Sequence, residues 1–332
     1  MDYILVTTIL IVIASLLFDF INGFHDTANA IATSVSTKAL KPRQAIFLAA
    51  IMNFLGAMTF TGVAQTITKD IVDPFTLNNG SVVIISALFA AILWNLITWY
   101  FGIPSSSSHA IIGAIAGAAI AASGFSAIKY SGFLKILEAL IFSPIIAFIV
   151  GYIIYSIFKV IFKENNLAKT NKRFRLIQVV TAALQAYTHG TNDAQKAMGI
   201  ITMALIANHY HHSTDIPLWV QVSCATAMGL GTSIGGWKII KTVGGKIMKI
   251  RPVNGVAADL SSALIIFGAT YIHLPVSTTH VISSSILGVG SAHRIRGVKW
   301  DTAQRMVITW VITLPVSAAL AAIIFFILNS FF

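Results

Sequence analysis

The stretch that decides the fold is Gly-Phe-His-Asp-Thr-Ala-Asn-Ala at residues 23–30, because it recurs as Gly-Thr-Asn-Asp-Ala-Gln-Lys-Ala at residues 190–197. A second pair of motifs follows in the same order. Pro-Ser-Ser-Ser-Ser-His occupies residues 104–109, and Pro-Val-Ser-Thr-Thr-His occupies residues 275–280. Two motifs repeated in one order and at similar spacing indicate an internal duplication of the kind found in membrane transporters.

The composition around these motifs is typical of a membrane protein. The 332 residues are 56% hydrophobic and 10% charged, with a mean hydropathy of +0.83, whereas soluble domains have about 25% charged residues. The apolar runs have helical length and lack the alternation of barrel strands. The predicted fold class is therefore all-α: a polytopic membrane protein with two inverted-topology repeats, broken helices and helical hairpins.

Ten apolar segments are expected to cross the membrane, five in each half of the chain. They lie at about residues 3–37, 44–67, 81–102, 105–123, 134–160, 176–207, 217–237, 255–273, 276–291 and 303–328. The two longest segments, 3–37 and 176–207, each contain one Gly-x-x-Asp motif. Each is interpreted as a pair of half-helices, around Gly23 and Gly190 respectively.

An odd number of crossings in the first half would invert the second half. The predicted boundaries are 1–162 for the first membrane repeat, 163–175 for a cytoplasmic linker, and 176–332 for the second, inverted repeat.

The basic residues lie between the apolar segments, where they orient the chain, and so they do not point to nucleic acid. With the N-terminus outside, 18 of the 22 Lys and Arg residues are cytoplasmic. Only Lys69, Lys129 and Lys135 are then outside, which leaves Lys196 as the one basic residue within the membrane.

Four acidic residues, Asp19, Asp26, Asp193 and Asp259, are predicted to lie in the membrane. A buried carboxylate there costs about 2.5–3.5 kcal/mol if it has no partner. For Asp19 and Asp259, a role in holding helices together and a functional role are equally consistent with the sequence. Asp26 and Asp193 each follow a glycine and precede, by three positions, a polar residue on the same helical face, which suits a cation or proton site.

The Pro-Ser/Thr motifs have the chemistry of an anion site. Proline fits the first turn of a helix, and the hydroxyl residues beside it add donors to the free backbone N–H groups. Two such helix N-termini related by inversion would direct their positive ends at one oxyanion. The alternative is close helix packing by small residues. Neither motif by itself names the substrate.

Residues 22–30 and 189–196 resemble the paired signatures of the Pit inorganic phosphate transporters. Residues 94–109 and 274–280 are similar to the hairpin entries of the same family. The resemblance implies a phosphate symporter of the bacterial, low-affinity branch, which is taken to be proton-coupled and able to carry metal-phosphate complexes. The predicted phosphate-binding residues are Ser105, Ser106, Ser107, Ser277, Thr278 and Thr279.

Two departures from the family pattern bear on the driving ion. Sodium-driven relatives tend to have Asn where this chain has His25, and a neutral residue where it has Lys196. The Lys196 ammonium could supply the charge of a bound Na⁺, and His25 is a titratable neighbour of Asp26, so proton coupling is predicted and sodium coupling is the alternative. The predicted coupling-ion or proton residues are His25, Asp26, Asn29, Asn192, Asp193 and Lys196.

Two other functions are alternatives to transport. An intramembrane metal-dependent enzyme would use His25, Asp26, His189 and Asp193 as ligands, but no nucleophile accompanies them, so no enzyme, cofactor or resident metal is predicted. A passive anion channel would not accumulate its substrate. The expected partners are inorganic phosphate, protons or Na⁺, a divalent metal carried with phosphate, membrane lipid and a second copy in a homodimer. The expected location is a bacterial or archaeal plasma membrane.

Overall fold

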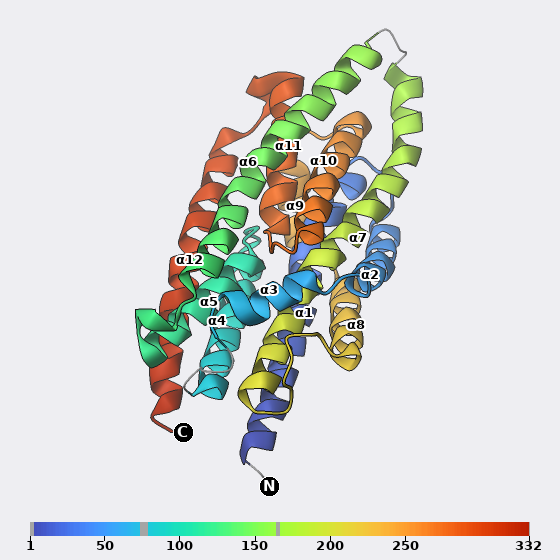
Figure 1. The fold of residues 1–332 in the computed structure, drawn as a ribbon. Helices are drawn as coiled ribbons and strands as arrows, with labels where there is room; N and C mark the ends of the chain where they lie inside the picture. Colours follow the sequence, from blue (N-terminus) through green and yellow to red (C-terminus); the bar gives the residue numbers. More distant parts are fainter. Residues whose placement is uncertain (1–2, 74–78, 164–166, 332) are drawn as a thin grey trace.

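The protein is a bundle of helices, and the computed structural model describes residues 3–73, 79–163 and 167–331 (Figure 1). The first half contains α1 (Tyr3–Ser36), α2 (Pro42–Ala57), α3 (Gly62–Asp70), α4 (Gly80–Phe101), α5 (Ser107–Ser123), the short 3₁₀ helix η1 (Phe125–Ala127) and α6 (Tyr130–Ile161). The second half contains α7 (Leu167–Ala207), α8 (Leu218–Ile234), α9 (Trp237–Gly245), α10 (Pro252–Tyr271), α11 (Thr278–Arg294), η2 (Ile295–Gly297) and α12 (Trp300–Asn329). The two halves therefore share one order of elements, and the all-helical prediction is confirmed.

Corresponding helices of the two halves run in opposite directions. α1 and α7 are antiparallel neighbours, since Asn208 hydrogen-bonds Thr8 at 2.8 Å near one end and Thr37 bonds Gln178 at 2.6 Å near the other. Figure 1 shows α6 and α12 likewise running opposite ways, with both chain termini at the same end. This arrangement agrees with an inverted second half.

The two Pro-Ser/Thr motifs form the tips of helical hairpins. The chain leaves α4 through Gly102, whose φ of 65° lies in the left-handed region, and then starts α5; α10 and α11 are joined through His273 in the same way (φ 62°). Each tip is buried against α1 or α7. The expected segments 81–102 and 105–123 thus form one hairpin, α4 with α5, and the segments 255–273 and 276–291 form a second, α10 with α11.

Each hairpin packs on the last helix of the other half: α5 on α12 and α11 on α6. Glycines allow the close approach, because a Cβ on Gly117 would lie 2.1 Å from the carbonyl oxygen of Ala318, and one on Gly288 would lie 2.0 Å from that of Phe148. The second hairpin thereby reaches into the first half, and the first into the second.

The prediction of half-helices around Gly23 and Gly190 is wrong, because α1 and α7 continue through both glycines. A Cβ on Gly23 would lie 2.5 Å from the carbonyl oxygen of Met228, and one on Gly190 would lie 2.3 Å from that of Asn53. These glycines therefore serve close packing of α1 on α8 and of α7 on α2. The break lies instead within the segment predicted at 44–67, where α2 and α3 meet at 66°.

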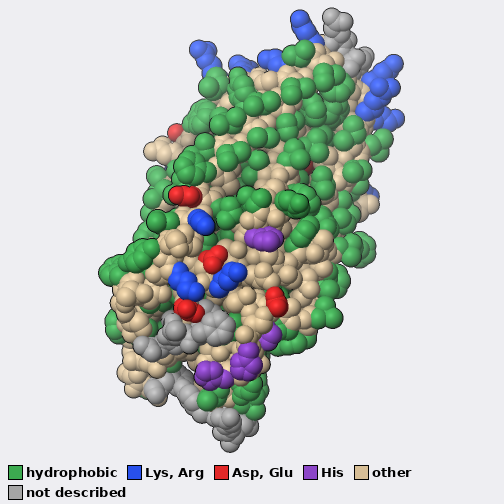
Figure 2. Space-filling model, viewed as in Figure 1, with side chains coloured by type: hydrophobic (Ala, Val, Ile, Leu, Met, Phe, Trp, Pro, Cys, Tyr) green, Lys and Arg blue, Asp and Glu red, His purple; other side chains and the backbone are tan. Residues whose placement is uncertain are grey.

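Five helices, α1, α4, α6, α10 and α12, are long and apolar enough to cross a membrane, or six spans if the bent pair α2 and α3 counts as one. These numbers refer to the described ranges. Large apolar side chains on α6 and α12 face outward, among them Ile141 and Val311. Lys and Arg gather at the end of the molecule where α6 meets α7 (Figure 2). α7 begins at Leu167, so most of the linker predicted at 163–175 is helical.

Candidate functional site

Asp26 lies within α1 and is a buried acceptor for groups from both hairpins. Ser107, in the first turn of α5, donates to its Oδ2 at 2.5 Å, and Thr279, in the first turn of α11, donates to its Oδ1 at 3.0 Å. The Nδ1 atom of His25 lies 2.7 Å from the same Oδ1. Charge-assisted hydrogen bonds of this kind hold an ionised carboxylate in an apolar interior.

Asp193, the corresponding residue of α7, has a different set of partners. Its Oδ1 forms an ion pair with the ammonium of Lys196, one turn later on the same helix. Its Oδ2 accepts a hydrogen bond from Thr278 at 3.0 Å and lies 3.3 Å from Nε2 of His189. Asp193, Lys196 and His189 all have no solvent exposure. A full positive charge therefore compensates this carboxylate.

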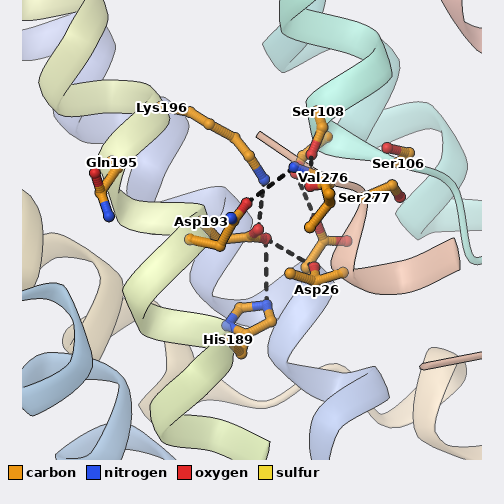
Figure 3. A network of polar contacts seen from close by, with 12 residues as sticks. Asp26, Ser106, Ser108, His189, Asp193, Gln195, Lys196, Val276 and Ser277 are labelled. Carbon is orange, nitrogen blue, oxygen red and sulfur yellow. Dashed lines mark hydrogen bonds and ion pairs between the residues drawn. The ribbon is translucent and has the colours of Figure 1, made fainter. Parts of the chain in front are cut away.

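The start of α11 joins the two centres, because Thr278 bonds Asp193 while its neighbour Thr279 bonds Asp26. Asn29 donates to Thr279 at 2.9 Å and so supports it from α1. Figure 3 shows Asp193 and Lys196 of α7 facing Asp26 of α1 and the labelled hairpin residues Ser106, Ser108, Val276 and Ser277.

A chain of polar contacts leads from Asp26 to the tip of the first hairpin. The Nε2 atom of His25 lies 3.1 Å from the hydroxyl of Thr98 on α4, and that hydroxyl accepts a hydrogen bond from Ser105 at 2.7 Å. Both ring nitrogens of His25 are thus engaged, one on each side. An imidazole placed in this way can take up a proton at one nitrogen and release one at the other.

Asn192 holds the tip of the second hairpin to α7. Its Oδ1 accepts a hydrogen bond from the backbone N–H of Val276 at 3.2 Å, and its Nδ2 donates to the carbonyl of Leu274 at 3.2 Å. Ser108 of the first hairpin donates to the carbonyl of Val276 at 2.8 Å, so the two tips are in contact.

The six hydroxyl residues predicted to bind phosphate have three kinds of partner. Ser107, Thr278 and Thr279 bond the two carboxylates, whereas Ser105 bonds Thr98. Ser106 and Ser277 are N-caps, because their hydroxyls accept from the backbone N–H of His109 (3.1 Å) and of His280 (3.2 Å). The residues predicted to bind phosphate and those predicted to bind the coupling ion therefore lie in contact with each other at one buried centre.

The two remaining membrane carboxylates differ in their surroundings. Asp259 on α10 accepts hydrogen bonds from Thr33 at 2.6 Å and Thr181 at 3.0 Å, which fits a role in joining helices. Asp19 on α1 is equally buried, yet within the described residues neither of its carboxylate oxygens has a hydrogen-bond partner.

The sequence does not predict a site role for Thr98, and it suggests His189 only as a metal ligand. His189 gave a usable signal, since it precedes Asp193 by four positions and therefore shares its helical face. Thr98 lies within residues 94–109, which resemble a hairpin entry of the family, but its role depends on the packing of α4 against α1.

Apolar outward-facing helices around a buried charged centre, with two hairpin tips meeting in it, define an integral membrane transporter. The profile of the phosphate transporter family matches residues 22–321, and the chain belongs to this family. The resemblance to the Pit transporters is thereby confirmed.

Two bacterial relatives, each described as a probable low-affinity inorganic phosphate transporter, match nearly the whole chain. The protein of Bacillus subtilis (strain 168) is 79% identical over 333 residues, covering 100% of both chains, and that of Rhizobium meliloti (strain 1021) is 44% identical over 95% of each. A solved structure described as "The sodium-dependent phosphate transporter" is similar with a TM-score of 0.87 and 25% identity, covering 98% of this chain and 100% of that one. The chain is thus an inorganic phosphate transporter and not an enzyme.

Proposed function

We propose that the protein is a proton-coupled phosphate symporter that works by alternating access in a bacterial or archaeal plasma membrane. The observation that carries this proposal is the polar chain from Asp26 through His25 and Thr98 to the first hairpin. It gives the carboxylate a titratable neighbour and links that neighbour to a hydroxyl of the predicted phosphate set.

The contacts of Asp26 suggest how proton and phosphate are coupled. An ionised Asp26 attracts the hydroxyl hydrogens of Ser107 and Thr279, which phosphate would also need. Protonation removes the charge that makes these hydrogen bonds strong, so the hydroxyls become free to donate to phosphate at the N-termini of α5 and α11. Phosphate would then bind best when Asp26 carries the transported proton.

The Lys196 ammonium disfavours a bound Na⁺ at the second centre. It already occupies one oxygen of Asp193 with a fixed positive charge, and a second cation beside it would meet repulsion in a medium of low dielectric constant. Sodium coupling is the second candidate, because the similar solved structure is described as sodium-dependent.

Uptake of phosphate into proteoliposomes, with the pH gradient and the Na⁺ gradient imposed separately, distinguishes the two. We expect accumulation with an inward proton gradient in the absence of Na⁺. Accumulation that requires Na⁺ and ignores the pH gradient would reject the proton assignment. Repeating the assay with a divalent metal added or chelated tests whether metal-phosphate is the cargo.

The membrane orientation is part of the same proposal. Residues 1–162 and 176–332 would form two inverted repeats with the N-terminus outside, supported by the antiparallel α1 and α7 and by the gathering of Lys and Arg at one end. In a Cys224→Ser background, a cysteine at Lys172 should be labelled from the cytoplasmic side and one at Ser126 from the outside. The reverse pattern would overturn the orientation. Cross-linking in the membrane would test the predicted homodimer.

A further inference from the structure

One face of α1 carries a polar stripe that extends beyond the site described above. Ser15, Asp19, Asn22, Asp26 and Asn29 are spaced by four, three, four and three residues, which places them on a single helical face. All five have at most 1% exposure. Asp26 and Asn29 belong to the phosphate site, whereas the first three residues have no part in it.

These three residues have unmet hydrogen-bonding capacity. Within the described residues, no hydrogen-bond partner exists for the hydroxyl of Ser15, for either carboxylate oxygen of Asp19, or for either amide atom of Asn22. Buried polar groups in proteins are nearly always paired, so each exception calls for a ligand or another specific reason. Asp259 is the useful contrast, because two threonines satisfy it.

A fourth unpaired side chain lies at the same level on α4. Asn208 bonds both Thr8 of α1 and Ser81 of α4, and 17 residues further along each helix His25 contacts Thr98. The helices therefore run parallel and in step, so that Asn95 and Asn22, each three residues earlier, lie level with each other. Both amide atoms of Asn95 are buried and without a hydrogen-bond partner.

The charges around Asp19 do not balance. Its charged neighbours are Asp193 and Lys196 on α7, and its titratable neighbour on α8 is Cys224. Lys196 is already paired with Asp193, and α4 contributes the neutral Asn95. With Asp19 ionised, the group of two carboxylates and one ammonium would keep one negative charge, which a single monovalent cation, Na⁺ or a proton, would neutralise.

We propose that Ser15, Asp19, Asn22 and Asn95 form a second, separate binding site for a monovalent cation, either Na⁺ or a proton. Their hydroxyl, carboxylate and amide oxygens are hard ligands suited to Na⁺, and a proton on Asp19 would supply the missing donor to a neighbouring amide oxygen. The site lies toward the N-terminal end of α1, which is the outer side in the proposed orientation. It adds a second cation to the one assigned to Asp26.

Ligand-dependent thermal stability of the purified, full-length protein tests this site without transport or phosphate. In one arm the concentration of NaCl is raised against choline chloride at constant ionic strength and fixed pH. In the other arm the pH is lowered in Na⁺-free buffer. For the unmodified protein we expect the melting temperature to rise by roughly 5 °C in one of the arms, which also identifies the cation.

The comparison is made in an Asp26→Asn background, so that the first cation cannot contribute. Asp19→Asn should remove the remaining rise, and Asn95→Ala should move its midpoint to at least tenfold higher cation concentration. Ser126→Ala, an exposed and distant change, should leave the rise intact. An unchanged rise in both Asp19→Asn and Asn95→Ala, or no rise in either arm before mutation, would overturn the proposal. Neither result bears on the relay through His25, which the uptake assay tests.

Discussion

The two halves of this transporter place an aspartate at the same point of the same motif and then surround it differently. Asp26 has a histidine and two hydroxyls as partners. Asp193 has a lysine, a histidine and one hydroxyl. The residue three positions after each aspartate differs as well. Asn29 donates to Thr279, whereas Lys196 binds Asp193 itself.

This difference separates the two centres by their charge. The second centre carries its own cation as a side chain, since Lys196 forms an ion pair with Asp193. The first centre has no lysine or arginine among its hydrogen-bond partners, which are His25, Ser107 and Thr279. In the proposed mechanism the first centre therefore carries the transported proton, whereas the second remains an ion pair.

The largest expected effect is that of Asp26→Asn, which removes the proposed proton carrier while keeping the size of the side chain. Accumulation of phosphate driven by a pH gradient should be lost, whereas exchange of internal for external phosphate persists, because exchange needs no net movement of protons. Both are measured in proteoliposomes with labelled phosphate. The exposed Asp301→Asn serves as the control. Accumulation at the unmodified level would show that Asp26 does not carry the driving proton.

The second centre should respond chiefly in stability. Lys196→Met leaves the buried Asp193 without its ammonium partner, and breaking a buried ion pair from one side costs about 3–5 kcal/mol. The double variant Asp193→Asn, Lys196→Met removes both charges and should regain much of that loss. Denaturation of the purified variants measures the difference. If the single and double variants are equally stable, the two charges are not coupled as the structure implies.

The sequence predicted one half of this comparison better than the other. The spacing of three residues between Asp193 and Lys196 on one helix is a local property, and their predicted contact is present in the structure. The same spacing suggested that Asn29 shares a site with Asp26, and in the structure Asn29 joins that site through Thr279 of the second hairpin rather than by a direct bond to Asp26. Such a contact depends on how α11 packs against α1, which no local spacing encodes.

The glycines illustrate the same limit. The motif predicts that the helices open at Gly23 and Gly190, which is one of two common uses of glycine in membrane helices. Their backbones instead touch Met228 and Asn53 on other helices. The choice between a break and a close contact depends on the neighbouring helix, so the motif could be recognised while its local structure was predicted wrongly.

A smaller effect is expected where the hairpins meet the two aspartates. Thr279→Ala removes a donor from the first centre, and Thr278→Ala removes one from the second. A hydrogen bond to a charged group contributes about 1.5–3 kcal/mol, so each change should weaken apparent phosphate affinity roughly ten- to a hundredfold if the hydroxyls bind phosphate. Concentration-dependent uptake provides the measurement. If only Thr279→Ala weakens the affinity, phosphate binds on the Asp26 side alone.

The smallest effect concerns the serines that begin the two hairpin helices. Ser106 and Ser277 were expected to bind phosphate, but in the structure their hydroxyls cap α5 and α11. Replacing such a cap with alanine costs about 1 kcal/mol. Ser106 also lies 2.9 Å from Nδ1 of His109, whereas Ser277 caps the backbone of His280 only. Ser106→Ala should therefore lower thermal stability more than Ser277→Ala, and neither should change phosphate affinity as much as Thr279→Ala does. A large loss of affinity with unchanged stability in Ser106→Ala would instead place this hydroxyl on the phosphate.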